Sequence, residues 1–152
     1  MGQTRSNGFT LIELLVVLVI LALLAGMASL GFGRSVQQRL DNTAQQAQLW
    51  LQQVQDTAVF TSSVWGVRVE KDSMQAYVWQ DDGSWLTTTD IENFAVPKQI
   101  ILSMALQVKE KEPQITLLPT GQIVPAADIL LEDSEYQIRL DWKESYQIQL
   151  LR

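Results

Sequence analysis

The chain offers few side chains that could do chemistry, and its carboxylates are the main candidates. It has no histidine and no cysteine, which removes the commonest general base, thiolate nucleophiles and most transition-metal ligands. Two local groups of acids remain, at Asp81-Asp82 and at Glu132-Asp133-Glu135. Carboxylates in such groups could act as an acid–base pair or bind calcium through their oxygens.

Neither acidic group has the pattern that these chemistries need. Asp81-Asp82-Gly83 is typical of a β-turn, and it lacks the spaced carboxylates of an EF-hand loop. No nucleophile or phosphate-binding loop accompanies either group. We therefore predict no catalytic residues, no metal site and no cofactor, and a protein that is not an enzyme.

A further carboxylate, Glu13, lies beside an apolar run. Residues 14–33 carry no charge, and a helix of about 20 residues spans roughly 30 Å, the thickness of a hydrocarbon core. An acid at bilayer depth costs roughly 2.5–3.5 kcal/mol. Because a plain membrane anchor has no use for such an acid, we expect Glu13 to meet a cation.

The polar part of the chain is acidic. Residues 61–152 hold 14 acids and 8 bases, which accounts for the whole net charge of −6. Nucleic acids bind to basic surfaces. The charge therefore argues against nucleic acid as a partner.

Between residues 34 and 60 the apolar residues follow a helical period. They recur at three- and four-residue steps, at Val36, Leu40, Ala44, Ala47, Leu51, Val54 and Ala58. One helix from about Phe9 to about Phe60 is predicted, apolar all round in its first half and on one side in its second. The glutamines between the apolar positions are predicted to form a solvated face: Gln37, Gln38, Gln45, Gln46, Gln48, Gln52, Gln53 and Gln55.

After residue 63 the period changes to two, which predicts strands. The sequence indicates strands at 65–70, 74–80, 85–89 and 115–118, and a final hairpin. A longer strand is predicted with these residues on one face: Ile100, Leu102, Met104, Leu106 and Val108. In that hairpin Tyr136, Ile138, Leu140 and Trp142 alternate with polar residues, and Tyr146, Ile148 and Leu150 return after a turn. Trp65, Trp85 and Trp142 are predicted to point inward. The expected fold is α+β, with a long N-terminal helix (a transmembrane half and an amphipathic half) packed on an antiparallel two-sheet β domain.

The stretch Gly8-Phe9-Thr10-Leu11-Ile12-Glu13-Leu14 resembles the processing site of type IV pilins and type II secretion pseudopilins. The resemblance implies that a prepilin peptidase/N-methyltransferase cuts after Gly8 and methylates the new N-terminus at Phe9. It also supplies the cation for Glu13, which would form an assembly salt bridge with the free N-terminal amine of an adjacent subunit. Two buried charges are tolerated when they are paired.

A single helix followed by an almost wholly β domain resembles the minor pseudopilin H (GspH) and FimT-type subfamily, as does the Pro119-Thr120-Gly121 turn with its following strand. The resemblance implies a pilin-like fold and a structural subunit of the type II secretion pseudopilus, which supports export of folded proteins across the outer membrane. Its partners would be the major pseudopilin and the other minor pseudopilins at the tip. The implied organisation is a leader peptide (1–8), a transmembrane and assembly helix in the bacterial inner membrane (9–33), an amphipathic continuation (34–60) and a periplasmic domain (61–152).

Other interpretations remain at this stage. A FimT-type minor pilin that captures DNA would need exposed lysines and arginines, and a plain signal anchor would keep Met1 as its N-terminus. The helix lacks the proline that many pilins carry. Gly26, Gly31 and Gly33 either provide a weak point in its place, since each costs about 1 kcal/mol of helix propensity, or allow close helix packing.

Overall fold

The computed structural model describes residues 11–106, 112–144 and 147–151, without the side chains of residues 25–35, 144 and 147. Two compact units divide between Val36 and Gln37. One helix, α1 (Leu11–Phe60), contributes to both units and continues through the three glycines noted above. The helix predicted to end near residue 60 is confirmed.

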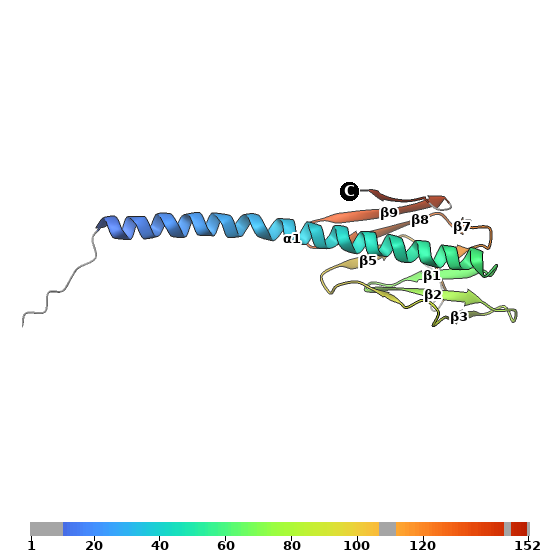
Figure 1. Cartoon of the computed structure of the whole chain (residues 1–152). Coiled ribbons are helices and arrows are strands. Elements are labelled where there is room, and N and C mark those ends of the chain that lie inside the picture. Colours follow the sequence, from blue (N-terminus) through green and yellow to red (C-terminus); the bar gives the residue numbers. More distant parts are fainter. Residues whose placement is uncertain (1–10, 107–111, 145–146, 152) are drawn as a thin grey trace, which may run out of the picture. The chain divides into compact units, whose positions relative to one another are not determined.

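The second unit contains two antiparallel sheets (Figure 1). The first sheet has the order β3-β2-β1-β6-β7, and β4 also pairs with β2. Its strands are β1 (Trp65–Val69), β2 (Ser73–Trp79), β3 (Trp85–Thr87), β4 (Phe94–Ala95), β6 (Ile115–Leu117) and β7 (Ile123–Val124). The second sheet has the order β10-β9-β8-β5. Its strands are β5 (Ile101–Met104), β8 (Ala127–Glu132), β9 (Gln137–Glu144) and β10 (Gln147–Leu151).

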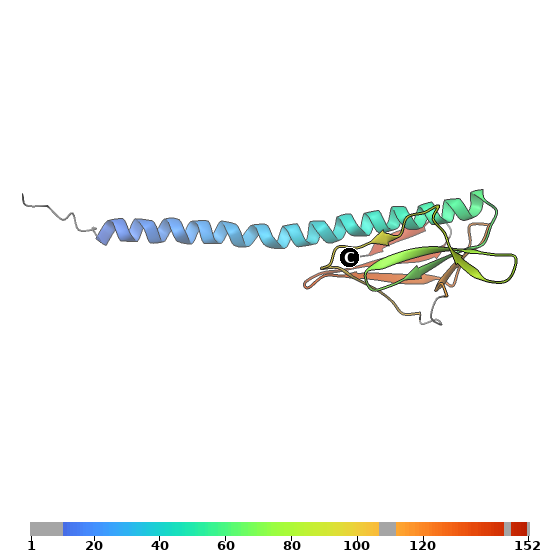
Figure 2. The ribbon, with the colours of Figure 1, turned by 90° about the horizontal axis from the view of Figure 1, so that it is seen from below.

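The core of this unit forms where the second half of α1 meets both sheets. In Figure 1 this half of the helix runs between the strands β1–β3 and the strands β8–β9, and Figure 2 shows it along one side of both sheets. Six of the seven predicted stripe positions are at most 1% exposed, and Val36 is half-buried. The buried stripe residues are Leu40, Ala44, Ala47, Leu51, Val54 and Ala58. The predicted fold class is therefore confirmed.

Several strand predictions hold and others need correction. Trp65 and Trp142 are buried as predicted, whereas Trp85 is half-buried on the outer face of the first sheet. The long strand predicted around residue 104 is wrong in length, because β5 ends at Met104. Met104 is also the last residue of β5 that pairs with β8, opposite Ile129. Val108 and Tyr146 lie outside the described residues. The strands β4 and β8 were missed.

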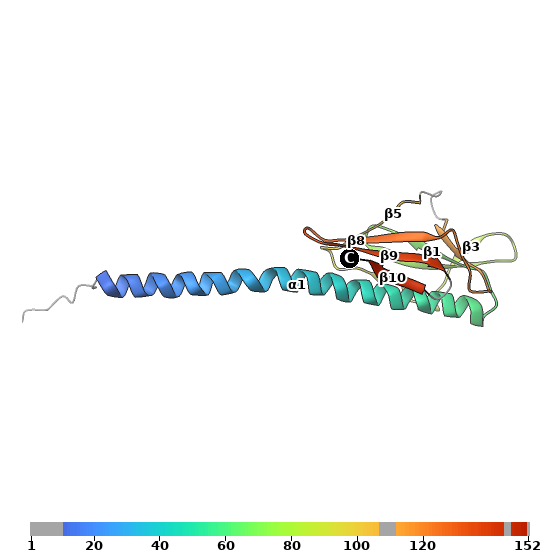
Figure 3. The same ribbon diagram turned by 90° about the horizontal axis from the view of Figure 1, so that it is seen from above.

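The prediction that all the glutamines of α1 face solvent is wrong at Gln48 and Gln55, and Gln52 is also half-buried. Gln55 is fully buried, and its Nε2 donates a hydrogen bond of 2.7 Å to the carbonyl of Gly121. Gln48 is half-buried, and its Nε2 donates to the carbonyl of Ile148 at 2.9 Å. Both residues border the apolar stripe on the helix, so they tie α1 to the β6–β7 turn and to β10 (Figure 3 shows β10 beside the helix).

We expect Gln55→Ala to lower the free energy of unfolding by about 1–3 kcal/mol, because the buried carbonyl of Gly121 would lose its donor. Chemical denaturation of the full chain in detergent micelles, followed by tryptophan fluorescence, measures the loss. Gln53→Ala, on the exposed side of the same helix, is the matched control and should stay within about 0.5 kcal/mol of the parent. Equal effects of the two substitutions would contradict the assignment.

Candidate assembly site

Glu13 lies in the first described turn of α1 and is exposed. An acid near a helix N-terminus gains about 0.3–1 kcal/mol from the helix dipole. That gain is smaller than the roughly 2.5–3.5 kcal/mol that an acid costs at bilayer depth. In the part of the chain that the structure describes, Glu13 has no hydrogen-bond or ion-pair partner.

Apolar side chains surround this carboxylate on every side of the helix. Twelve large hydrophobic residues of α1 between residues 11 and 24 are 46–86% exposed. They are Leu11, Ile12, Leu14, Leu15, Val16, Val17, Leu18, Val19, Ile20, Leu21, Leu23 and Leu24. A contiguous apolar surface of this kind marks an interaction site with protein or membrane.

The predicted cleavage residues, Gly8 and Phe9, lie outside the described residues. Their roles therefore stay predictions. Within the described side chains, no helical segment combines the length and apolar character needed to cross a bilayer.

The two acidic groups of the second unit have structural partners. The Oδ1 atom of Asp82 accepts hydrogen bonds from the hydroxyl and the backbone N–H of Ser84, at 2.6 and 3.0 Å. These bonds, the hydroxyl first, hold the pKa of Asp82 below its usual value. The side chain of Asp133 is almost fully buried, and its Oδ2 lies 3.9 Å from the guanidinium of Arg39. Among the described residues no cluster of three metal-ligating side chains is found.

Several cations of this unit lie beside carboxylates. Lys143 Nζ lies 2.6 Å from Asp141 Oδ2, and this hydrogen bond is the main cause of the raised pKa of Lys143. Arg68 Nε lies 3.0 Å from Glu70 Oε1. Pairing of this kind leaves fewer cations available for phosphates than the sequence count suggests.

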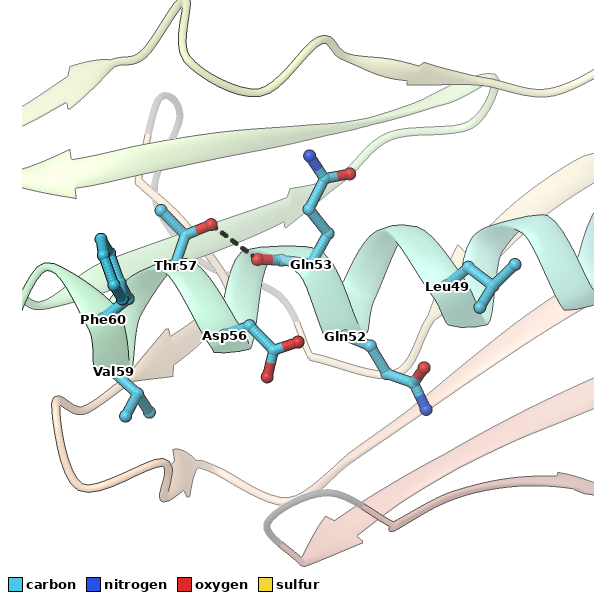
Figure 4. A pocket seen from close by; sticks show the side chains of 7 residues that line it. All are labelled: Leu49, Gln52, Gln53, Asp56, Thr57, Val59 and Phe60. Atoms are coloured by element: carbon cyan, nitrogen blue, oxygen red, sulfur yellow. Dashed lines mark hydrogen bonds between the residues drawn. The ribbon is translucent and has the colours of Figure 1, made fainter.

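A second surface lies near the end of α1, on the side away from the stripe. Seven residues line an open depression there: Leu49, Gln52, Gln53, Asp56, Thr57, Val59 and Phe60 (Figure 4). Leu49 and Phe60 are 64% and 91% exposed. Asp56 is the only ionisable residue of the lining, so the depression offers contact area and no catalytic pair.

The comparisons with known proteins agree with this arrangement. The prokaryotic N-terminal methylation motif matches residues 3–29. The chain is 30% identical over 138 residues to type II secretion system protein H of Pseudomonas aeruginosa, covering 79% of this chain and 80% of that protein. The chain belongs to the type II secretion protein H family. It is also 26% identical over 157 residues to protein H of Aeromonas hydrophila, covering 89% of this chain and 86% of that protein.

Solved structures of this family share the fold. Two structures of the minor pseudopilin EpsH from the type II secretion system of Vibrio cholerae superpose with TM-scores of 0.61 and 0.62 at 16% identity. The superposition with the first structure includes 74% of this chain and 96% of the EpsH chain, and that with the second includes 76% and 95%. The sequence did not predict that Gln55 is buried, and it wrongly placed Trp85 inward. The position of Gln55, four residues after Leu51 and three before Ala58, was the available signal.

We expect a fragment of residues 37–152 to be monodisperse without detergent, because it retains the second compact unit and none of the twelve exposed hydrophobic residues. The full chain should need detergent, since exposed apolar surface associates at about 25 cal/mol per Å² buried. Size-exclusion chromatography with light scattering compares the two. A fragment that aggregates as the full chain does would show that the exposed hydrophobic residues of α1 are not the cause of the association.

Proposed function

We propose that this protein is a structural minor pseudopilin that joins the type II secretion pseudopilus and supports export of folded proteins across the outer membrane. The similarity to protein H over four-fifths of each chain carries the proposal. The exposed, apolar first part of α1, with Glu13 in its first described turn, supports it.

In this proposal each part of the chain has one task. Residues 1–8 are a leader, residues 9–33 are the inner-membrane and assembly helix, residues 34–60 continue it, and residues 61–152 form a periplasmic domain. The uncharged run from Leu14 to Gly33 supports the membrane placement. The partners are the prepilin peptidase/N-methyltransferase, the major pseudopilin and the other minor pseudopilins.

Assembly then depends on a charge pair made between subunits. Cleavage after Gly8 creates a free amine at Phe9, and this amine of one subunit meets Glu13 of its neighbour. Removing one member of a buried ion pair costs about 3–5 kcal/mol, because the other charge is left unpaired. The pair therefore selects processed subunits in the correct register.

The charge of the second unit favours secretion over DNA capture. Residues 61–152 carry −6, and Lys143 and Arg68 lie beside carboxylates. Phosphate backbones require a basic surface. No nucleic acid partner is therefore proposed.

Processing is tested by the intact mass of the chain from a host that contains its secretion system. We expect the mature chain to begin at Phe9 and to carry one added methyl group. Gly8→Val should leave residues 1–8 attached, since the proposed cleavage follows a glycine, while Asn7→Ala should be processed normally. A parent chain that keeps Met1 would indicate a plain signal anchor.

The role of the charge at position 13 is tested with Glu13→Gln and Glu13→Leu. Both variants should insert into the membrane at least as well as the parent, because a costly charge is removed. Both should lower incorporation into sheared pseudopili, and with it secretion, by about tenfold or more. Leu14→Ile is the matched control and should behave as the parent. Normal assembly of Glu13→Gln would show that the pair is not needed.

A further inference from the structure

The β2–β3 hairpin carries an aromatic pair on its outer face. Trp79 and Trp85 lie directly opposite each other, with ring centroids 5.0 Å apart in an edge-to-face arrangement. The backbone N–H of Trp79 donates to Val64 on the β1 side, at 2.9 Å. Trp79 and Trp85 are therefore a non-hydrogen-bonded pair, the kind in which facing side chains approach most closely.

This alternation determines which backbone groups β3 turns outward. The N–H of Gln80 donates to the carbonyl of Ser84, and the N–H of Thr88 donates to the carbonyl of Ala76. Ser84 and Thr88 therefore belong to hydrogen-bonded pairs of this hairpin, and Trp85 and Thr87, next to them in the chain, do not. In an antiparallel ladder, the intervening residues point their N–H and C=O groups away from β2.

Among the described strands, none occupies that side of β3. β3 is the terminal strand of the first sheet and the outermost strand in Figure 1. Leu86 is 57% exposed and Thr87 is exposed. Within the described part of the chain, no backbone hydrogen bond is recorded from the outward N–H groups of Trp85 and Thr87. An open edge of this kind is a template for strand addition.

The two faces of this edge have similar chemistry. A strand added to β3 would place alternate side chains beside Trp85 on one face and beside Leu86 on the other, and both neighbours are apolar. Natural proteins protect an open edge by keeping the strand very short or with lysine, proline or a bulge. β3 is short, with the three residues Trp-Leu-Thr, but it has no lysine, proline or bulge. The side chains of this edge therefore leave it open to a short added segment.

The turn of the hairpin adds charge to this surface. Asp81 and Asp82 are consecutive acids at the tip, and neither lies within 4 Å of a cation among the described residues. The hydrogen bonds from Ser84 hold Asp82 in its charged form. A bound strand that extends past Trp85 toward the tip would meet negative charge.

We propose that the outer edge of β3 binds an extended segment of a partner protein by strand addition, and that this segment combines apolar residues with a basic residue facing Asp81 and Asp82. The proposal goes beyond the assembly role of α1 and does not depend on it. A second copy of this chain fits the edge poorly, because its own 61–152 segment also carries −6. The partner is thus a different protein with a basic strand.

The test uses the full chain in detergent micelles and a short peptide of alternating valine and threonine that ends in two lysines. A peptide of the same design ending in two glutamates is the comparison. Binding is measured by fluorescence anisotropy of the labelled peptide at low and physiological salt. Hydrogen exchange reports whether the Thr87 amide becomes protected.

Two variants separate the backbone contribution from the charge contribution. Thr87→Pro removes the outward N–H, and proline is tolerated on an edge strand because that N–H has no internal partner. Thr87→Val keeps the N–H and is its matched control. Asp81→Asn removes charge from the tip without touching the Ser84 bonds of Asp82.

We expect the lysine peptide to bind and to protect the Thr87 amide, and the glutamate peptide to bind at least about tenfold more weakly. Thr87→Pro should weaken binding about tenfold while Thr87→Val does not, and Asp81→Asn should weaken it severalfold at low salt. No binding, or equal binding to Thr87→Pro and Thr87→Val, would overturn the proposal. A dimer of the chain that Thr87→Pro dissociates would instead identify a second copy as the occupant, and would also overturn it.

Discussion

The structure of the second unit depends on covering one apolar stripe. The stripe from Leu40 to Ala58 is buried almost completely, although the opposite side of the same helix carries exposed residues such as Leu49 and Phe60. Each sheet contributes its inner face to this burial, and burial of apolar side chains is the dominant favourable term in folding. The hydrogen bonds of Gln48 and Gln55 then fix where each sheet meets the helix. The helix is therefore the central element of the domain.

The sequence predicted the parts of this fold that depend on local periodicity. The change from period 3.6 to period 2 near residue 63 correctly separated α1 from β1, and the Asp82-Gly83 pair correctly marked the β2–β3 turn, where Gly83 has a positive φ of 80°. The end of β5 could not be predicted in this way. Its alternating pattern continues past Met104, whereas its pairing with β8 ends at Met104 and Ile129. Strand length here depends on a distant partner.

The same distinction applies to the functional surfaces. Gly8, Phe9 and Glu13 could be predicted as site residues because their motif is contiguous, and of these three the structure describes Glu13. The open edge of β3 was not recognisable, because it depends on which residues form hydrogen-bonded pairs with β2. Likewise, Gln55 is distinguished from its neighbouring glutamines by contact with a carbonyl 66 positions away in the sequence. The place of Gln55 beside the stripe is a local signal, but the sequence does not indicate which carbonyl it contacts.

The packing of α1 on both sheets also has a mechanical consequence. A pull along the axis of the helix at Gln37 would load the contacts from Leu40 to Ala58 together, in shear, because they are distributed along that axis. The hydrogen bonds of Gln48 and Gln55 to two separate segments would share the same load. Peeling the strands away one at a time would instead break the contacts in sequence. The domain is thus built to resist axial tension delivered through its own helix.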